Sequence, residues 1–131
     1  MKQVKLKSRN IRGKVIRTNN HKIEEIIGLW QQVPSMSLKG TIYAVYYHYK
    51  SDHHGDYDFL IGNESYQFDE TITLSEGNYL KIEVLEATPE KVGQAWQKIW
   101  QDSNIYEKRL FTTDFEEYLS TGQVNIYLAI Q

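Results

Sequence analysis

The stretch Arg109-Leu-Phe-Thr-Thr-Asp-Phe-Glu-Glu-Tyr118 decides how the chain is interpreted. Side chains alternate between the two faces of a β-strand, so an extended segment here has two distinct faces. One face carries Phe111, Thr113, Phe115, Glu117 and Leu119, and its two aromatic rings suit a core. The opposite face carries Thr112, Asp114, Glu116 and Tyr118. A solvated strand more often carries Lys, Ser or Thr, so two carboxylates and a phenol together predict a lined cavity.

The composition is that of a globular protein with one domain. The chain has 131 residues, of which 40% are hydrophobic and 24% charged, and this length supports a single core. The formal net charge is −2, whereas a nucleic-acid-binding domain usually has a basic face. The basic residues near the start alternate with apolar ones, as on the exposed face of a strand. Direct binding to nucleic acid is therefore not expected.

Two further absences narrow the class of protein. The chain has no cysteine, which excludes a disulfide framework and a thiol nucleophile. No apolar run approaches the roughly 20 residues that a membrane-spanning helix needs. The first residues, Met1-Lys-Gln-Val4, lack the apolar stretch of a signal peptide. We expect a cytoplasmic protein that does not associate with membranes.

The chain is predicted to form one domain over residues 1–131, built from two similar halves at about 3–62 and 77–131. In the first half, a strand over 3–17 precedes a helix that ends before Pro34, and strands at 41–49 and 57–61 form a hairpin. Apolar residues at helical spacing mark that helix: Ile23, Ile26, Ile27 and Trp30. Its N-cap is expected within residues 18–21.

The second half repeats this order. A strand at 77–86 precedes a helix with Thr88 at its N-cap and Pro89 at its first position, and strands at 109–119 and 124–130 follow. A shift of 70 residues takes Thr18 to Thr88, Trp30 to Trp100 and Tyr46 to Glu116. The connection between the halves is expected to add a short strand at 66–68 or at 71–74.

These elements predict an α+β fold. Two pseudo-symmetric strand-helix-hairpin units merge into one antiparallel sheet with two helices on one side, and a cleft lies between the units. Ligand sites favour such junctions, because residues from separate elements converge there.

Four segments carry a resemblance to a known family. They are the hairpin strand Ile42-Tyr-Ala-Val-Tyr-Tyr-His-Tyr49, its turn Ser51-Asp-His-His-Gly-Asp-Tyr57, the helical Ala95-Trp-Gln-Lys-Ile-Trp100, and the late strand Thr113-Asp-Phe-Glu-Glu-Tyr118. In this order the chain resembles a stand-alone GyrI-like domain. That family is the effector-binding module at the C-terminus of AraC-type and some MerR-type transcription activators. The resemblance covers nearly the whole chain.

The resemblance implies a lipophilic small-molecule ligand, often cationic, bound in the cleft between the halves. It also implies a buried acid on the late strand as the charge partner, and Glu116 is the matching residue with Tyr118 beside it. The chain has no helix-turn-helix region, so it is not itself the complete activator, and a link to transcription regulation or drug response through a protein partner stays open. No cofactor is implied, and the oligomeric state is open.

The residues themselves leave alternatives for these positions. Glu116 is either a partly desolvated cleft carboxylate or the partner of a nearby basic residue such as Arg109, Lys108 or Lys98. Asp114 shares its face and is either a second cleft carboxylate or a turn or cap residue. Tyr118 is a ligand donor or a tyrosine at the rim. Glu117, on the opposite face, is expected to be solvated or at an edge.

On the paired strand, Tyr46 and His48 are the cleft candidates, because the 70-residue shift places them opposite Glu116 and Tyr118. Tyr43 and Tyr47 then belong to the core, unless a bulge reverses the assignment. Trp96 and Trp100 share one helical face, which is typical of core, and one of the rings, Trp96, is a candidate cleft wall.

A polar cluster between the first hairpin strands raises a metal hypothesis, which we reject in favour of a polar hairpin loop. The spacing lacks the geometry of a helical His pair, and no distant ligand is evident. The cluster comprises His48, Asp52, His53, His54, Asp56 and Asp58. No metal site is expected.

Three functions compete at this stage. The favoured one is a binding module for a hydrophobic cation or drug-like molecule. The second is a small hydrolase of cyclopropane-type electrophiles, in which Glu116 is base or nucleophile and Tyr118 the acid. The third is a protein-interaction module, such as an inhibitor of DNA gyrase.

Overall fold

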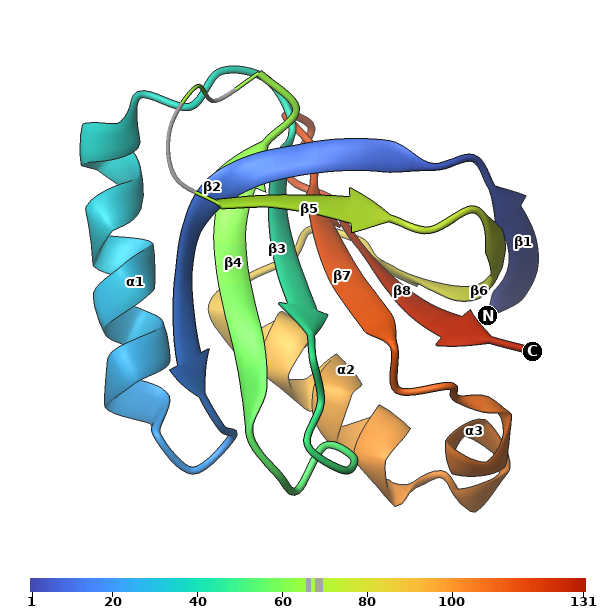
Figure 1. The fold of residues 1–131 in the computed structure, drawn as a ribbon. Helices are drawn as coiled ribbons and strands as arrows, with labels where there is room; N and C mark the ends of the chain where they lie inside the picture. Colours follow the sequence, from blue (N-terminus) through green and yellow to red (C-terminus); the bar gives the residue numbers. More distant parts are fainter. Residues whose placement is uncertain (66, 68–69) are drawn as a thin grey trace.

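In the part of the chain that the structure describes, eight antiparallel strands form one strongly curled sheet, and helices α1 and α2 cover its outer face (Figure 1). The computed structural model describes residues 1–65, 67 and 70–131. The strands are β1 (Lys2–Leu6), β2 (Arg9–Thr18), β3 (Ile42–Tyr47), β4 (Tyr57–Asn63), β5 (Glu70–Leu74), β6 (Gly77–Val84), β7 (Thr113–Tyr118) and β8 (Val124–Ile130). The helices are α1 (Ile23–Met36), α2 (Pro89–Gln101) and α3 (Ser103–Lys108). The predicted α+β class is confirmed.

The two halves meet in the middle of the sheet. Its strand order is β1-β6-β8-β7-β3-β4-β2-β5, so β3 of the first half pairs with β7 of the second. Val45 lies opposite Phe115 in this pair, and the two positions are related by the 70-residue shift. The pseudo-twofold axis therefore passes through the β3·β7 pair.

The outermost strands are exchanged between the halves. β1 precedes β2 in the chain but pairs with β6, and β5 precedes β6 but pairs with β2. The strand expected over 3–17 is therefore two strands, interrupted at Lys7 and Ser8. Of the two positions expected for a connecting strand, 71–74 lies within β5, whereas Tyr66 and Phe68 lie outside the described residues.

Two facing glycines allow β2 to bend and serve two partners. β2 pairs with β5 through Arg9–Gly13 and with β4 through Arg12–Thr18. Gly13 lies opposite Gly62, where the backbones approach so closely that a Cβ at Gly13 would lie 2.0 Å from the carbonyl oxygen of Ile61. Only glycine fits such a contact between backbones.

The curled sheet has a core on each face. The inner face buries Tyr43, Val45, Tyr47 and Phe115, so Tyr43 and Tyr47 belong to the core as the alternation predicted. The outer face packs Ala44 and Phe59 under α1, and it packs Ile126 and Leu128 under α2. Glu117 is also on the inner side, but it is not solvated as expected. Its carboxylate accepts hydrogen bonds from Tyr43 at 3.2 Å and from Asn125 at 3.0 Å.

The helices differ from expectation at their ends. Thr88 accepts the backbone N–H of Lys91 at 3.2 Å and caps α2 as predicted, but α1 has no side-chain cap. α1 also continues past Pro34 to Met36, since a proline in the last turn forfeits only one intrahelical bond. The third helix, α3, was not expected. Asp102 caps α3 by accepting hydrogen bonds from two backbone N–H groups. Because α3 comes first, the late strand begins at Thr113 and not at residue 109 as predicted.

A buried ion pair fixes the start of β7. Arg109 donates to Asp114 at 2.7 Å, and their side chains are 1% and 0% exposed. Asp114 also accepts hydrogen bonds from the Tyr49 hydroxyl at 2.6 Å and from the Ala129 backbone N–H at 2.9 Å. These contacts tie β7 to the end of α3, to the β3–β4 loop and to β8.

We expect Asp114→Asn to lower the free energy of unfolding by about 3–5 kcal/mol, because it leaves the Arg109 charge buried without its counter-charge. Asp58→Asn is the matched control. Asp58 pairs with Arg17 at 3.3 Å in a half-exposed setting, so its loss should cost less than about 1 kcal/mol. Urea denaturation of both variants measures the difference, and equal losses would contradict the prediction.

Candidate functional site

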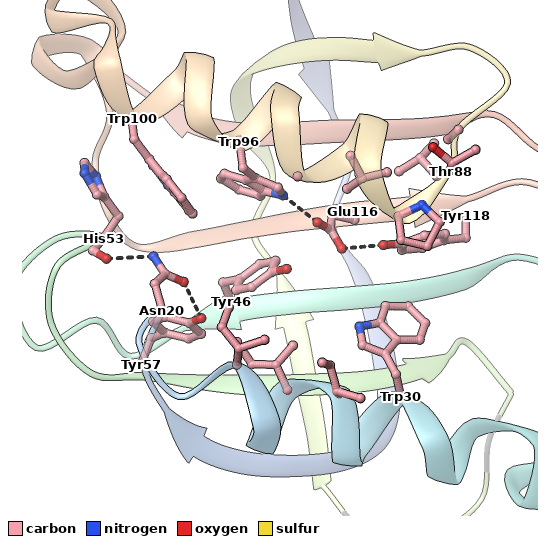
Figure 2. Close-up of a pocket in the computed structure, with 18 of the residues that line it drawn as sticks. Asn20, Trp30, Tyr46, His53, Tyr57, Thr88, Trp96, Trp100, Glu116 and Tyr118 are labelled. Atoms are coloured by element: carbon pink, nitrogen blue, oxygen red, sulfur yellow. Dashed lines mark hydrogen bonds between the residues drawn. The ribbon is translucent and has the colours of Figure 1, made fainter.

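A cavity of about 760 Å³ lies between α1 and α2 above the outer face of the sheet. This volume is typical of sites for drug-sized ligands. Its floor comes from the central strands and its walls from the two helices (Figure 2). Residues that line it include Ile23, Ile26, Ile27 and Trp30 from α1, Val92, Gly93, Trp96 and Trp100 from α2, and Tyr46, Tyr57, Glu116 and Tyr118 from the strands.

Glu116 is the buried acid of this cavity. Its side chain accepts a hydrogen bond from the indole N–H of Trp96 at 2.5 Å and from the Tyr118 hydroxyl at 2.8 Å (Figure 2). The residue is only 2% exposed, and no Lys, Arg or His in the described part of the chain forms an ion pair with it. The expected alternative, a salt bridge to Arg109, is not formed, because Arg109 pairs with Asp114.

Burial dominates the electrostatics of Glu116. Desolvation raises the pKa of its carboxyl above 4.5, and the hydrogen bonds from Trp96, Tyr118 and Tyr46 only partly offset this effect. Burial and the neighbouring Glu116 also raise the pKa values of Tyr46 and Tyr118. Both hydroxyls therefore stay protonated, and the carboxylate is surrounded by neutral donors rather than by a cation.

Aromatic rings enclose Glu116 from both halves. Trp30 meets Tyr118 edge to face with ring centroids 5.0 Å apart, and Tyr46 meets Trp96 in the same manner at 5.4 Å. Each pair joins a helix to a strand of the opposite half of the chain. Ring faces attract cations, so these walls suit a positively charged aromatic guest.

The end of the cavity away from Glu116 is lined by neutral polar side chains. Figure 2 shows Asn20, His53, Tyr57 and Trp100 at this end, away from Glu116. The Tyr57 hydroxyl donates to the side-chain oxygen of Asn20 at 2.6 Å, and the Asn20 amide donates to the His53 carbonyl at 2.7 Å. The His53 ring stacks on Trp100 at 5.8 Å, and burial lowers its pKa below 6.5. This imidazole is therefore neutral at pH 7.

The structure brings four of the six sequence-predicted site residues together in the cavity: Glu116, Tyr118, Tyr46 and Trp96. It leaves Asp114 outside, enclosed by Arg109, Tyr49 and the backbone of Ala129. His48 also lies outside. The strand ends at Tyr47, and His48, with a φ of 51°, turns toward solvent and bonds to Asp58 at 2.7 Å.

Sequence reasoning missed much of the α1 side and the His53 end. The α1 stripe was used only to mark a helix, yet its members Ile23 and Ile27 are 55% and 48% exposed and line the cavity. Trp30 of the same stripe also lines the cavity. His53 was grouped with polar loop residues. Among the described residues, no three His, Cys, Asp or Glu side chains come together in a way that could hold a metal ion.

Comparisons with known proteins agree with this geometry. Residues 4–130 match the model of the Cass2 family, described as integron-associated effector binding protein. An integron cassette protein from the mobile metagenome of Vibrio cholerae is 26% identical, with a TM-score of 0.84 over 99% of this chain and 95% of that one. No curated protein matches by sequence. Within the described residues, no helix is long and apolar enough to cross a membrane.

Two more distant structures share the fold. One is described as a bacterial transcription regulation protein from Staphylococcus aureus, with 19% identity, a TM-score of 0.76, and coverage of 99% of this chain and 97% of that one. The other is SAV2435 bound to tetraphenylphosphonium, with 18% identity, a TM-score of 0.78, and coverage of 99% and 93%. At such identities the likeness shows the fold alone.

The Trp96 contact predicts a shift in the titration of Glu116. We expect Trp96→Phe to raise the pKa of Glu116 further, because it removes an N–H that stabilises the carboxylate. Carboxyl ¹³C shifts of glutamate-labelled protein, assigned with Glu116→Gln, measure the titration midpoint. Trp100→Phe is the control, since Trp100 lines the cavity at its other end. A lower midpoint in Trp96→Phe than in the native protein would contradict the assignment.

Proposed function

The chain belongs to the Cass2 family of integron-associated effector-binding proteins, and we propose that it captures lipophilic organic cations in the cavity around Glu116. One observation carries the proposal. A carboxylate with 2% exposure lines an aromatic cavity without a cationic partner among the described residues. Burying an unpaired carboxylate is costly, and a cationic ligand would offset that cost.

The walls support the same class of ligand. Four rings, from Trp30, Tyr46, Trp96 and Tyr118, surround the carboxylate. Each cation–π contact contributes about 0.5–2 kcal/mol, with the larger values in desolvated sites. SAV2435, which has the same fold, binds the aromatic cation tetraphenylphosphonium, and this supplies a probe. A link to transcription regulation or drug response through a partner protein belongs to the same proposal, supported by the shared fold with a transcription regulation protein.

The charge of the ligand is testable with two ions of the same shape. We expect the native protein to bind tetraphenylphosphonium more tightly than tetraphenylborate, its anionic counterpart. Glu116→Gln keeps the size of the side chain but removes its charge. It should weaken phosphonium binding about tenfold to a hundredfold. Quenching of tryptophan fluorescence measures both affinities, and thermal melting of the variant shows whether it is folded. Unchanged phosphonium affinity in Glu116→Gln would sink the proposal.

A glycine that lines the cavity allows a test of the space available to the ligand. Gly93 is exposed on α2 and lines the cavity, and a Cβ built there meets no atom within 4 Å. Gly28 on α1 has the same open space but is not among the lining residues. The two glycines are therefore a matched pair, because replacing either should favour its helix by about 1 kcal/mol.

We expect Gly93→Leu to weaken binding of tetraphenylphosphonium about fivefold to a hundredfold, because a side chain at this lining position crowds the ligand. Binding of the smaller phenyltrimethylammonium should change less. Gly28→Leu should leave both affinities at the native level. Isothermal titration calorimetry with the two cations makes the comparison, and equal effects of the two variants would show that Gly93 does not border the ligand.

One contact favours a second candidate function. The Tyr118 hydroxyl donates to Glu116 at 2.8 Å, which places a base or nucleophile beside an acid, as a hydrolase of electrophiles requires. The same Glu116→Gln variant separates the two functions. A binding protein shows no turnover of a cyclopropane-type electrophile in either form, whereas an enzyme loses turnover in the variant.

A further inference from the structure

The charges of the chain are strongly segregated along the sequence. Residues 1–23 contain eight of the 15 basic residues and no acidic residue, whereas residues 24–131 contain the other seven basic residues and all 17 acidic ones. The first segment therefore carries a formal charge of +8 and the rest of the chain −10. The small net charge of −2 hides this asymmetry, which is typical of a segment that binds a negatively charged partner.

The structure places this positive charge on β1 and β2, away from the cavity. None of residues 1–18 lines the cavity, and β1 lies on the opposite side of the molecule from α1 (Figure 1). Arg9 and Arg17 form ion pairs with Glu117 and Asp58. Four further basic side chains are exposed and form no ion pair within the described part of the chain. This basic strip consists of Lys2, Lys5, Lys7 and Arg12.

β1 is an edge strand, so one side of its backbone has no partner strand in the described sheet. Such an edge offers a row of N–H and C=O groups to an added strand. The lysines lie on both faces of β1. Val4 and Leu6 pack on the inner core, so Lys2 shares their face and Lys5 lies on the opposite face. The alternating side chains of an added strand would therefore meet a lysine on each face.

One cross-strand pair of β1 is unfavourable without such a partner. Lys2 lies directly opposite Lys81 of β6, and like charges at opposite positions destabilise a pair of strands. Glu83 reaches Lys81 at 3.7 Å, but Lys2 has no counter-charge among the residues that the structure describes. A carboxylate beside Lys2 on an added strand would supply that counter-charge.

The distribution of charge selects among negatively charged partners. A long polyanion such as nucleic acid extends beyond the strip, and the remainder of the chain, with its charge of −10, repels it. Pairing with β1 of a second copy is disfavoured, because it brings lysines together at the edge. A short acidic segment of another protein avoids both penalties. In extended form it also matches the free backbone of β1.

We propose that the free edge of β1 binds an acidic, extended segment of a partner protein, with Lys2 and Lys5 as the charge contacts. Lys7 and Arg12 extend the positive surface toward β2. The inference rests on the proposed function, because it assigns a surface to the partner protein through which the chain acts in regulation. The partner segment leaves the cavity accessible, since none of these four residues lines it.

Short fluorescein-labelled peptides test this surface on the full chain, with fluorescence anisotropy as the measurement. One peptide repeats glutamate-glutamate-valine, which puts carboxylates on both faces of an extended segment. The other has proline in place of each valine, which keeps the charge but removes backbone donors and disfavours strand pairing. We expect the valine peptide to bind about threefold to tenfold more tightly. Equal affinities would overturn strand addition at β1.

Charge reversal on β1 locates the site. The double variant Lys2→Glu, Lys5→Glu should weaken binding of the valine peptide about tenfold. Its matched control is Lys91→Glu, Lys98→Glu, which reverses two exposed lysines of α2 and should change the affinity by less than about twofold. Equal losses in the two variants would overturn the site, because they would reflect net charge alone. Thermal melting monitors the fold, and Lys2→Glu also gives Lys81 an opposite charge across the strands.

A measurement on the native protein does not depend on any variant. The backbone amide signals of Lys2–Leu6 should shift in ¹H–¹⁵N spectra when the valine peptide is added, and those of Glu116 and Tyr118 should remain in place. Shifts at the cavity without shifts in β1 would contradict the assignment. An oligothymidylate of the same charge as the peptide should bind more weakly, and tighter binding would assign the strip to nucleic acid and overturn the proposal.

Binding of tetraphenylphosphonium to the same samples separates this inference from the proposed function. If the phosphonium binds and the valine peptide does not, only the β1 surface fails. If the peptide binds at β1 and the phosphonium does not bind, the proposed capture of cations fails and the β1 surface stands.

Discussion

The pairing of β3 with β7 is the constraint on which the rest of the structure depends. It joins the two halves in one sheet and places Val45 opposite Phe115 on the pseudo-twofold axis. Strand alternation then determines to which face of the sheet each neighbouring side chain points. Phe115 enters the inner core, whereas Asp114 and Glu116 turn to the outer face under the helices. A slip of one residue would exchange these faces and send both carboxylates into the aromatic inner core.

The two carboxylates of β7 show how burial is compensated in different ways. Asp114 is fully buried and receives a full counter-charge from Arg109. Glu116, two residues later, is almost as buried and receives the neutral donors Trp96, Tyr118 and Tyr46 but no cation among the described residues. Desolvation therefore dominates its electrostatics and raises its pKa. Of the two carboxylates, Asp114 is neutralised by Arg109, whereas Glu116 has no cation beside it in the described part of the chain. Glu116 is therefore the carboxylate that is suited to a cationic ligand.

Much of this arrangement could be predicted from local rules. Period-two alternation placed Glu116 and Tyr118 on one face, and the 70-residue shift placed Tyr46 beside them. The same shift failed for His48, because the strand ends at Tyr47 and the next residue takes a left-handed conformation. Such a backbone reversal depends on the loop that follows. The exchange of β1 and β5 could not be predicted from local sequence rules either. Each of these strands could pair with either of two similar strands, and the pairing is decided by contacts between residues far apart in the sequence.

The α1 wall was missed for a related reason. Apolar residues at helical spacing indicate a buried face, but they do not tell what covers it. In this fold α1 packs on the sheet through Leu29, which lies outside the stripe, while Ile23 and Ile27 remain exposed at the cavity. Trp30 of α1 meets Tyr118 from the second half, and Trp96 of α2 meets Tyr46 from the first. Neither half could build these walls alone. The cavity therefore exists only while β3 and β7 are paired, and any ligand that binds there stabilises the pairing itself by mass action.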